Sequence, residues 1–425
     1  MVRFLFSVVV MYACGWEVCR VGVADWPQFR GPTGDGHART QALPIRWSES
    51  QNVIWKVPVP GLGWSSPVVK DGRIYVTTAV PRESESNENS EGHSLELVCF
   101  RAQDGKLIFR KALFEQTGPV QMHKKNSHAS PTPLLHNNNI FVHFGPHGTA
   151  CTTLDGEVVW TCVLPYEPQH GNGGSPVLAD GVLVICCDGK DVQYVVGLNP
   201  KTGEQVWKTN RDTKPKKGFS FGTPLWLPAS QSEDQRDQVI CPGSDAVFSY
   251  NPRNGKELWR FDYPNGYSVI PRPVFGHGLV YICSGYDKPS LFAIRPTGRG
   301  NVTETHGAWM IDQGAPHTPS LLLHNNEIYL VSDRGIATCL DARTGGEHWR
   351  ERLGGNFSAS PFLAGDNIYF QNETGEAIVI KAGTTYQEVS RNEIGDGDRT
   401  FASYAVEGNH LLLRSETSLY ALGTN

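Results

Sequence analysis

The sequence predicts an all-β fold, an eight-bladed β-propeller of four-stranded antiparallel blades. A single phrase recurs along the chain: Ser-Pro and an apolar stretch, an Asp-Gly turn, two β-branched runs, Thr-Gly-Lys or a variant, and Trp. The 425 residues include 45 Gly and 28 Pro, which separate short apolar runs. A period in the forties built from four short strands is typical of a propeller. The copies begin at Ser66, Ser130, Ser175, Thr223, Arg272, Thr318 and Ser360, and a degenerate copy begins at Ser403.

The unit at residues 176–208 shows the expected blade most clearly. Its two Gly-containing turns suit hairpins, because Asp, Asn and Gly tolerate a positive φ. We call its strands A to D from the axis to the rim, with Trp207 on the rim strand. The predicted strands are 176–178, 182–187, 192–198 and 205–208.

The ring is expected to close through the start of the chain. The last unit ends at Asn425 before a fourth strand, whereas Asn52–Val57 is an isolated strand that carries Trp55. We predict that this segment forms the rim strand of the last blade, which removes two open sheet edges. Residues 52–425 then form the propeller, and 25–51 a lead-in. The other predicted rim aromatics are Phe109, Trp160, Trp207, Trp259, Trp309 and Trp349.

The first 24 residues are expected to be a signal peptide, and the mature protein to be exported. Arg3 precedes ten mostly apolar residues, which is too short for a bilayer span of about 20 residues. Gly22-Val23-Ala24 is the expected cleavage site. A lipid anchor on Cys14 is the alternative, and Met11-Tyr12 is a poor sequence before such a cysteine.

Charge and cysteine usage exclude several classes of function. The net charge of −5 and the lack of a basic stripe argue against nucleic acid. Ten cysteines include no C-x-x-C pair, so no metal site is expected, and buried thiols act as small apolar fillers. Cys186 and Cys187 are adjacent on a predicted strand, where alternation points them to opposite sides; a vicinal disulfide would need a distorted turn.

Three segments carry a family resemblance: 199–207, 251–259 and 341–349. They resemble the tryptophan-docking repeat of the pyrroloquinoline quinone (PQQ) propeller family, and Asp25–Gly31 looks like the start of its mature exported members. The resemblance covers nearly the whole chain from about residue 52. It implies the propeller fold and two branches of function. Quinoprotein dehydrogenases hold PQQ and calcium on the axis, with a vicinal disulfide over the quinone, whereas scaffold proteins of the BamB type lack the cofactor.

The candidate site lies where the D–A and B–C connections share one face around the axis. The acidic candidates for calcium there are also ordinary turn residues. The B–C turns contribute His147, Asp188, Asp191, Asp245, Asp287, Asp333, Glu373 and Glu416. The candidate ligand-binding residues from the D–A connections are Trp64, His128, Asn172, Tyr267, Arg272 and His317.

The interpretation we favour is a monomeric, non-catalytic binding or scaffold module with no cofactor and no metal. Its partner would be a protein segment or a small ligand at the axial face, or a strand paired with a blade edge. One alternative is a small PQQ- and calcium-dependent oxidoreductase. Another is carbohydrate or peptide binding at a mouth lined by Trp64, Tyr267, Phe357 and Phe401.

Overall fold

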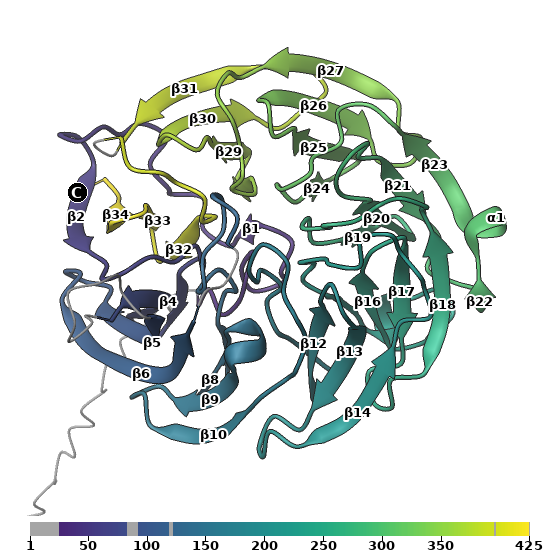
Figure 1. The fold of residues 1–425 in the computed structure, drawn as a ribbon. Coiled ribbons are helices and arrows are strands. Elements are labelled where there is room, and N and C mark those ends of the chain that lie inside the picture. The colour runs from purple at the N-terminus through teal and green to yellow at the C-terminus, as the bar shows by residue number, and fades with distance from the viewer. Residues whose placement is uncertain (1–24, 83–91, 119–121, 395–396, 425) are drawn as a thin grey trace, which may run out of the picture.

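Eight antiparallel sheets stand around a central axis and form a closed ring (Figure 1). The computed structural model describes residues 25–82, 92–118, 122–394 and 397–424, so the expected signal segment lies outside the described residues. The predicted all-β, eight-bladed propeller is confirmed. Among the described residues, no helix combines the length and the apolar character that crossing a bilayer requires.

Blades 1 to 4 follow the order of the sequence from the axis to the rim. Blade 1 is β3 (Val68–Lys70), β4 (Arg73–Pro81), β5 (Gly92–Arg101) and β6 (Leu107–Thr117). Blade 2 is β7 (Leu134–His136), β8 (Asn139–His143), the short helix η1 (Gly145–His147), β9 (Thr149–Thr153) and β10 (Val158–Cys162). Blade 3 is β11 (Val177–Ala179), β12 (Val182–Asp188), β13 (Gln193–Leu198) and β14 (Gln205–Asn210). Blade 4 is β15 (Leu225–Leu227), the short helix η2 (Ala229–Gln231), β16 (Gln238–Pro242), β17 (Ala246–Tyr250) and β18 (Glu257–Asp262).

Blades 5 to 8 complete the ring. Blade 5 is β19 (Val274–Gly276), β20 (Leu279–Cys283), β21 (Leu291–Ile294) and β23 (Gly307–Ile311). Blade 6 is β24 (Leu322–His324), β25 (Glu327–Val331), β26 (Ile336–Asp341) and β27 (Glu347–Arg352). Blade 7 is β28 (Phe362–Ala364), β29 (Asn367–Gln371), β30 (Glu376–Lys381) and β31 (Glu388–Glu393). Blade 8 is β32 (Ala405–Glu407), β33 (His410–Arg414), β34 (Ser418–Leu422) and β2 (Val53–Pro58).

Two short strands extend blades beyond four strands. Strand β1 (His37–Ala38) pairs in parallel with β28 at the axis, and β22 (Gly300–Asn301) pairs in parallel with β18 at the rim. A single helical turn, α1 (Thr303–His306), follows β22. The outer edge of blade 4 is therefore covered by the chain itself.

The rim tryptophans of blades 2, 3, 5, 6 and 8 pack on the C–D turn of the next blade, whereas Trp259 of blade 4 donates to Oε1 of Gln238 in its own blade. The indole Nε1 of Trp207 donates to the carbonyl of Pro252 at 2.7 Å, and that of Trp160 donates to the carbonyl of Pro200 at 3.0 Å. A Cβ atom added at Gly255 would lie 2.4 Å from the ring of Trp207, and φ at this glycine is +69°. The Gly and the Trp of the repeated phrase are thus two halves of one inter-blade contact.

The ring closes as the sequence predicts. Strand β2 pairs antiparallel with β34, so the start of the chain supplies the outermost strand of blade 8 (Figure 1, purple beside yellow). From this position Trp55 donates its Nε1 proton to the carbonyl of Ala102 in blade 1 at 2.9 Å and packs against Gly105. The same tryptophan contact therefore joins the first blade to the last.

The repeat is offset by two residues in two blades. We placed the second and sixth copies at Ser130-Pro131 and Thr318-Pro319. The A strands of these blades begin at Leu134 and Leu322, so the residues equivalent to Ser66 are Thr132 and Ser320. The second copy contains two prolines two residues apart, and Ser320 precedes Leu321 instead of a proline, which explains the offset.

The lead-in segment runs inside the ring along the innermost strands. Trp26 exchanges two backbone hydrogen bonds with Val69 of β3, at 3.0 and 2.8 Å. Further along, the carbonyl of Pro27 accepts a hydrogen bond from the backbone N–H of Leu135, and β1 adds to β28. Trp26 is 2% exposed. The lead-in thus fills part of the central channel before β2 closes the ring.

We predict that Trp55→Ala lowers the free energy of unfolding by about 3–5 kcal/mol, because it removes a large buried side chain that joins blade 8 to blade 1. The measurement is urea unfolding followed by tryptophan fluorescence and circular dichroism. The matched control is Val206→Ala, which truncates a half-exposed rim side chain and should change stability by less than about 0.5 kcal/mol. Equal losses for the two variants would contradict the role of Trp55 in closing the ring.

Candidate functional site

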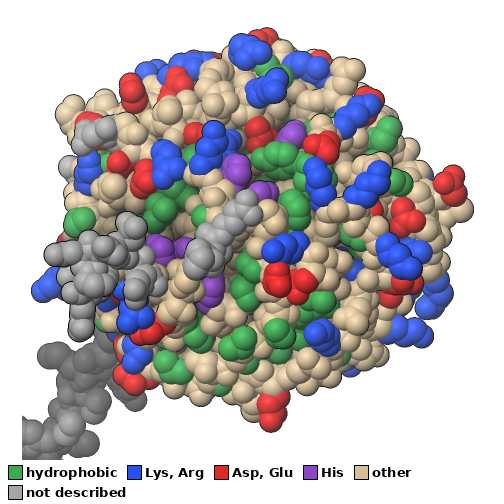
Figure 2. All heavy atoms as spheres, in the orientation of Figure 1, with side chains coloured by type: hydrophobic (Ala, Val, Ile, Leu, Met, Phe, Trp, Pro, Cys, Tyr) green, Lys and Arg blue, Asp and Glu red, His purple; other side chains and the backbone are tan. Residues whose placement is uncertain are grey.

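A cavity opens at the axis on the face formed by the D–A connections, as expected for the candidate site. Its volume is about 250 Å³. Aromatic side chains and hydroxyl groups form most of its wall, and histidine and hydrophobic side chains gather around the centre of this face (Figure 2). The aromatic lining residues are Phe29, Trp64, Phe219, Phe221, Tyr267, Tyr286 and Phe401.

A ring of hydroxyl groups encircles the cavity just above the innermost strands. In six of the eight blades, the residue that enters strand A donates its backbone N–H to the hydroxyl of the next blade, at 2.9–3.0 Å. The bonds run from Ser66 to Thr132, Thr132 to Ser175, Ser175 to Thr223, Arg272 to Ser320, Ser320 to Ser360 and Ser360 to Ser403. Each accepting hydroxyl lines the cavity and still has its own proton to donate. We call these six side chains the hydroxyl ring.

Phe29 of the lead-in forms the base of the cavity, and Arg272 fixes it there. The guanidinium of Arg272 donates from Nη1 to the carbonyl of Phe29 at 2.8 Å and from Nε to the carbonyl of Pro224 at 3.1 Å. Arg272 is 2% exposed, and burial lowers its pKa to about 10. Arg272 occupies the position that Ser or Thr holds in other blades. The hydroxyl ring has no bond between blades 4 and 5, and Arg272 joins these blades through its bond to Pro224.

The connection between blades 1 and 2 reaches across the entrance. Lys125 pairs with Glu373 of the B–C turn in blade 7, with 2.5 Å between Nζ and Oε1, and Ser358 donates to the same carboxylate oxygen at 2.6 Å. His123 donates its backbone N–H to the carbonyl of His170. Burial lowers the pKa of His123, and His170 adds to this effect, so His123 is neutral at neutral pH. His123, Lys125 and His170 all line the cavity.

A cluster of histidines lies beside the entrance in blades 1 and 2. The ring of His128 is 4.7 Å from that of His93 and 5.8 Å from that of His147, between centroids. Burial, with smaller effects from these neighbours, lowers the pKa of His128 to about 4. Below them, burial lowers the pKa of His143 to about 3; its Nδ1 contacts the hydroxyl of Thr149 at 2.8 Å, and its Nε2 has no partner among the described residues. His128 and His143 are therefore neutral at neutral pH.

The structure separates the six residues that we named as ligand-binding candidates. Trp64 and Tyr267 line the cavity. Arg272 lies at its base, bonded to Phe29. Three others lie behind the wall: His128 in the histidine cluster, Asn172 bonded through Oδ1 to Tyr166 at 3.0 Å, and His317 against the ring of Tyr286 at 4.5 Å.

The position of a residue in the repeat predicts some of the cavity residues but not others. Phe401 was expected at the mouth and lines the cavity, whereas Phe357 is fully buried between blades. The hydroxyl ring has a sequence signal in four of its six members, a Ser or Thr before the strand A proline, which is also a feature of the repeat; Ser320 and Ser403 precede Leu and Tyr instead. Phe29 has no such signal, because the lead-in lies outside the repeats.

The acidic side chains of the B–C turns are engaged by the protein itself. Asp188 forms two hydrogen bonds with Arg211, Asp333 accepts from Thr318 and the backbone of His317, and Asp287 accepts from Tyr267. The remaining contacts are Asp191 with the backbone of Glu167, Asp245 with the backbone of Asn265, Glu373 with Lys125, and Glu416 with Arg399. Within the described ranges, no group of three or more His, Cys, Asp or Glu side chains has the arrangement needed to hold a metal ion.

The acidic side chains of the described B–C turns are not gathered as ligands of one calcium ion. Calcium needs six to eight oxygen ligands that converge at about 2.3–2.6 Å. Here the acidic groups of the B–C turns are spread around the mouth, and each accepts hydrogen bonds from its own neighbourhood. The adjacent cysteines do not form the disulfide of the dehydrogenase branch either. Cys186 packs toward blade 4 and Cys187 toward blade 2, as strand alternation requires, and both are free thiols.

Comparisons with known proteins agree with this architecture. The family model described as "outer membrane protein assembly factor BamB" matches residues 45–223 and 243–423. Among solved structures, BamB from Moraxella catarrhalis superimposes with a TM-score of 0.59 at 13% identity, over 88% of this chain and 97% of that chain. A quinohemoprotein alcohol dehydrogenase from Comamonas testosteroni gives 0.60 at 12% identity, over 95% and 81%. At these identities the likeness shows the fold alone.

A curated protein with detectable sequence similarity is tetrathionate hydrolase from Acidithiobacillus ferrooxidans. The two are 25% identical over 185 residues, which is 40% of this chain and 35% of the hydrolase. The match therefore spans about a third of that protein.

The burial of His143 leads to a prediction about the stability of the fold at acidic pH. Since the pKa of His143 is about 3 in the folded state and about 6.5 unfolded, the unfolded state binds more protons between these values. The stability from neutral His143 is complete above pH 6.5 and is lost as the pH falls toward 3. We predict that the free energy of unfolding of His143→Gln falls between pH 7 and pH 4.5 by about 2 to 3 kcal/mol less than that of the unaltered protein. The measurement is urea unfolding at both pH values. His136→Gln, on the exposed end of β7, should leave the pH dependence unchanged.

Proposed function

This chain belongs to the family described as outer membrane protein assembly factor BamB, and on that premise we propose that it is a non-catalytic binding module with its ligand site in the axial cavity. The ligand is a protein segment or a small molecule that places an aromatic or apolar group against the aromatic side chains and accepts hydrogen bonds from the hydroxyl ring. The observation that carries this proposal is the cavity itself, where aromatic rings surround donors that have protons to give.

The donors of the cavity favour a ligand rich in acceptors. The six members of the hydroxyl ring each accept one backbone N–H, which leaves their protons directed to other acceptors. The indole Nε1 of Trp64 is buried without a partner among the described residues. A buried donor without a partner is costly, so a carbonyl, carboxylate or sugar hydroxyl of a ligand would relieve it.

The size of the cavity limits what can enter. A volume of about 250 Å³ is at or just below the range of about 300–1,000 Å³ for sites that enclose a drug-sized ligand. One or two side chains of an extended segment, or a single sugar ring, match it better than a large cofactor does. Tyr267 and Trp64 at the mouth supply flat surfaces against which such a group can stack.

The rim supports a scaffold role through a second surface. Apolar side chains of the D strands in blades 1 to 3 are between 44% and 50% exposed, whereas Trp160 and Trp207 beside them are buried. The exposed side chains are Leu107 and Ile108 on β6, Val158 and Val159 on β10, and Val206 on β14. Apolar residues at equivalent positions on neighbouring blades form a stripe that a protein partner can cover.

One further part of the proposal rests on the sequence and on the family. We place the protein outside the cytoplasm, because the family is described by outer membrane assembly and residues 1–24 have the pattern of a signal peptide.

Carbohydrate binding is the second candidate function, favoured by the combination of aromatic rings and hydroxyl groups in one cavity.

The test fills the cavity without breaking the hydroxyl ring. Ile270 lines the wall, and Ile270→Trp places a bulky ring in the space that a ligand would occupy. Binding is measured by isothermal titration calorimetry with short peptides that carry aromatic side chains and with neutral oligosaccharides. We expect one class to bind saturably to the unaltered protein and to bind at least about tenfold more weakly, a loss of about 1.4 kcal/mol, to Ile270→Trp.

The matched control is Met310→Trp, which adds the same ring at a 54% exposed position on β23 of blade 5. It should bind as the unaltered protein does. Binding that survives Ile270→Trp would move the site out of the cavity, to the rim. Saturable binding of PQQ with calcium, together with dye-linked oxidation of alcohols, would overturn the non-catalytic proposal.

A further inference from the structure

Two cysteines of neighbouring blades face each other across one blade interface. Cys186 lies on β12 of blade 3 and Cys241 on β16 of blade 4, and both belong to the apolar cluster between these blades. Cys187 points the other way and packs with Tyr194 and Trp160 at the interface with blade 2. Strand alternation therefore separates the adjacent pair and brings Cys186 to the partner blade.

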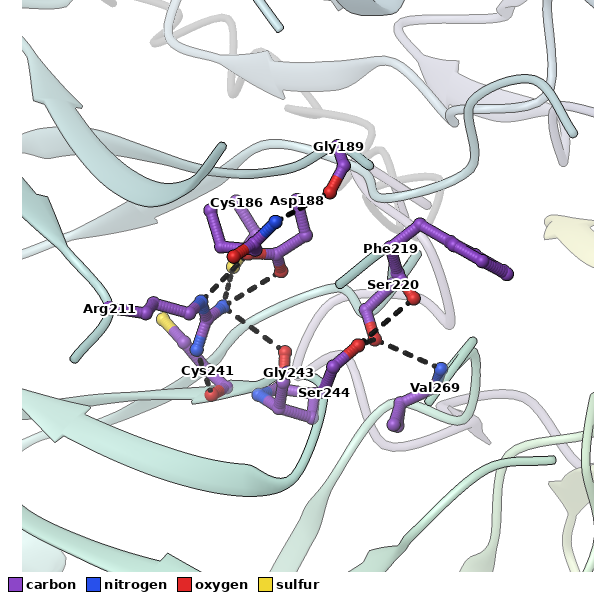
Figure 3. A network of polar contacts seen from close by, with 12 residues as sticks. Cys186, Asp188, Gly189, Arg211, Phe219, Ser220, Cys241, Gly243, Ser244 and Val269 are labelled. Atoms are coloured by element: carbon purple, nitrogen blue, oxygen red, sulfur yellow. Dashed lines mark hydrogen bonds and ion pairs between the residues drawn. The ribbon is translucent and has the colours of Figure 1, made fainter. Parts of the chain in front are cut away.

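A buried guanidinium joins the two cysteine positions. Nη2 of Arg211 lies 3.4 Å from Sγ of Cys186, and Nη1 donates to the backbone carbonyl of Cys241 at 3.0 Å (Figure 3). Burial raises the pKa of the Cys241 thiol well above its ordinary value, and the neighbouring Cys186 adds to this effect. Arg211 is held in place by Asp188, at 2.8 and 3.0 Å.

The charge of Arg211 persists at neutral pH. Burial would lower the pKa of this guanidinium, yet the carboxylate of Asp188 holds it well above its ordinary value. Burial raises the pKa of Asp188 itself, but only to about 6, so the pair remains charged at pH 7. A fixed positive charge thus lies beside Sγ of Cys186.

The environment of this thiol differs from that of other described cysteines. Cys99 and Cys339 lie against the tyrosines of their own blades, and Cys283 is fully enclosed among apolar residues. Cys186 is only partly buried, whereas Cys241 is 0% exposed. One thiol of the pair can therefore meet a reagent from solvent, and the second can complete a reaction from inside the interface.

We propose that Cys186 and Cys241 are a redox-active pair that forms a disulfide between blades 3 and 4. The oxidant is a small disulfide such as glutathione disulfide. Cys186 loses its proton to solvent and attacks one sulfur of the oxidant, whose S–S bond breaks to release one glutathione thiolate. Cys241 loses its proton and attacks Sγ of Cys186, which releases the second. Two protein thiols are oxidised to one disulfide, and one glutathione disulfide is reduced to two thiols.

Arg211 assists the first step and links the pair to the wall of the axial cavity. Its Nη2 can neutralise the negative charge on Sγ of Cys186 while this atom reacts. The backbone N–H of Ser220 donates to the carbonyl of Asp188 at 3.4 Å, the hydroxyl of Ser220 contacts that of Ser244 at 3.3 Å, and Ser244 donates to the carbonyl of Phe219, a residue of the cavity wall (Figure 3). A disulfide at this place would fix the two blades whose connection carries Phe219 and Phe221.

The experiment uses the full mature chain in its folded state. Protein reduced with dithiothreitol is incubated with glutathione disulfide, the remaining thiols are alkylated, and the digest is analysed by mass spectrometry without reduction. We expect a cross-linked peptide that joins Cys186 to Cys241 and lacks two hydrogens. We also expect a higher Tm for the oxidised protein, because a cross-link between positions far apart in sequence restricts the unfolded chain.

Three variants decide the outcome. Cys241→Ala should abolish both the cross-link and the rise in Tm, and should leave Cys186 as a mixed disulfide with glutathione. Cys186→Ala should abolish both and leave Cys241 unmodified. Cys187→Ala should retain the cross-link. A disulfide between Cys186 and Cys187, the absence of any cross-link, or a lower Tm of the oxidised protein would overturn the proposal.

Discussion

The contact between a rim tryptophan and a glycine of the next blade is the interaction on which the rest of this molecule depends. A blade buries its faces only against its neighbours, so the ring is stable only when the last interface is made. Trp55 makes that interface from a strand at the start of the chain, with its N–H on Ala102 and its ring on Gly105. The closure therefore ties the two ends of the chain together, and unfolding of any blade exposes two interfaces at once.

The closed ring also determines where ligand chemistry can occur. Strand A begins at an equivalent position in each blade, so the hydroxyl that recurs in six blades forms a circle of donors around the axis. The lead-in then occupies the channel below, and Phe29 turns what would be an open passage into a cavity with a base. Repetition supplies the wall of the site, and the segment without repeats supplies its base.

Because the repeats form the wall and the segment without repeats forms the base, the sequence predicts the propeller better than it predicts the residues of the cavity. Asp-Gly turns, Trp and Gly act locally, and each copy confirms the others, so the number of blades and the closing strand could be derived. Trp64 and Tyr267 were accessible from their position in the repeat. Phe29 was not, because nothing local indicates that the lead-in enters the channel. Arg272 was visible as a break in the Ser/Thr pattern, but its two carbonyl partners come from segments that only the fold brings together.

Strand alternation limits the redox chemistry that a propeller of this kind can use. Adjacent cysteines on a regular strand lie on opposite faces, so Cys186 and Cys187 belong to two different blade interfaces. A thiol on such a strand finds its partner in the next blade, at equal depth from the axis. The pair of Cys186 with Cys241 follows from this geometry. Arg211, which contacts Sγ of Cys186 and the backbone of Cys241, adds a fixed positive charge that can stabilise a thiolate at this interface.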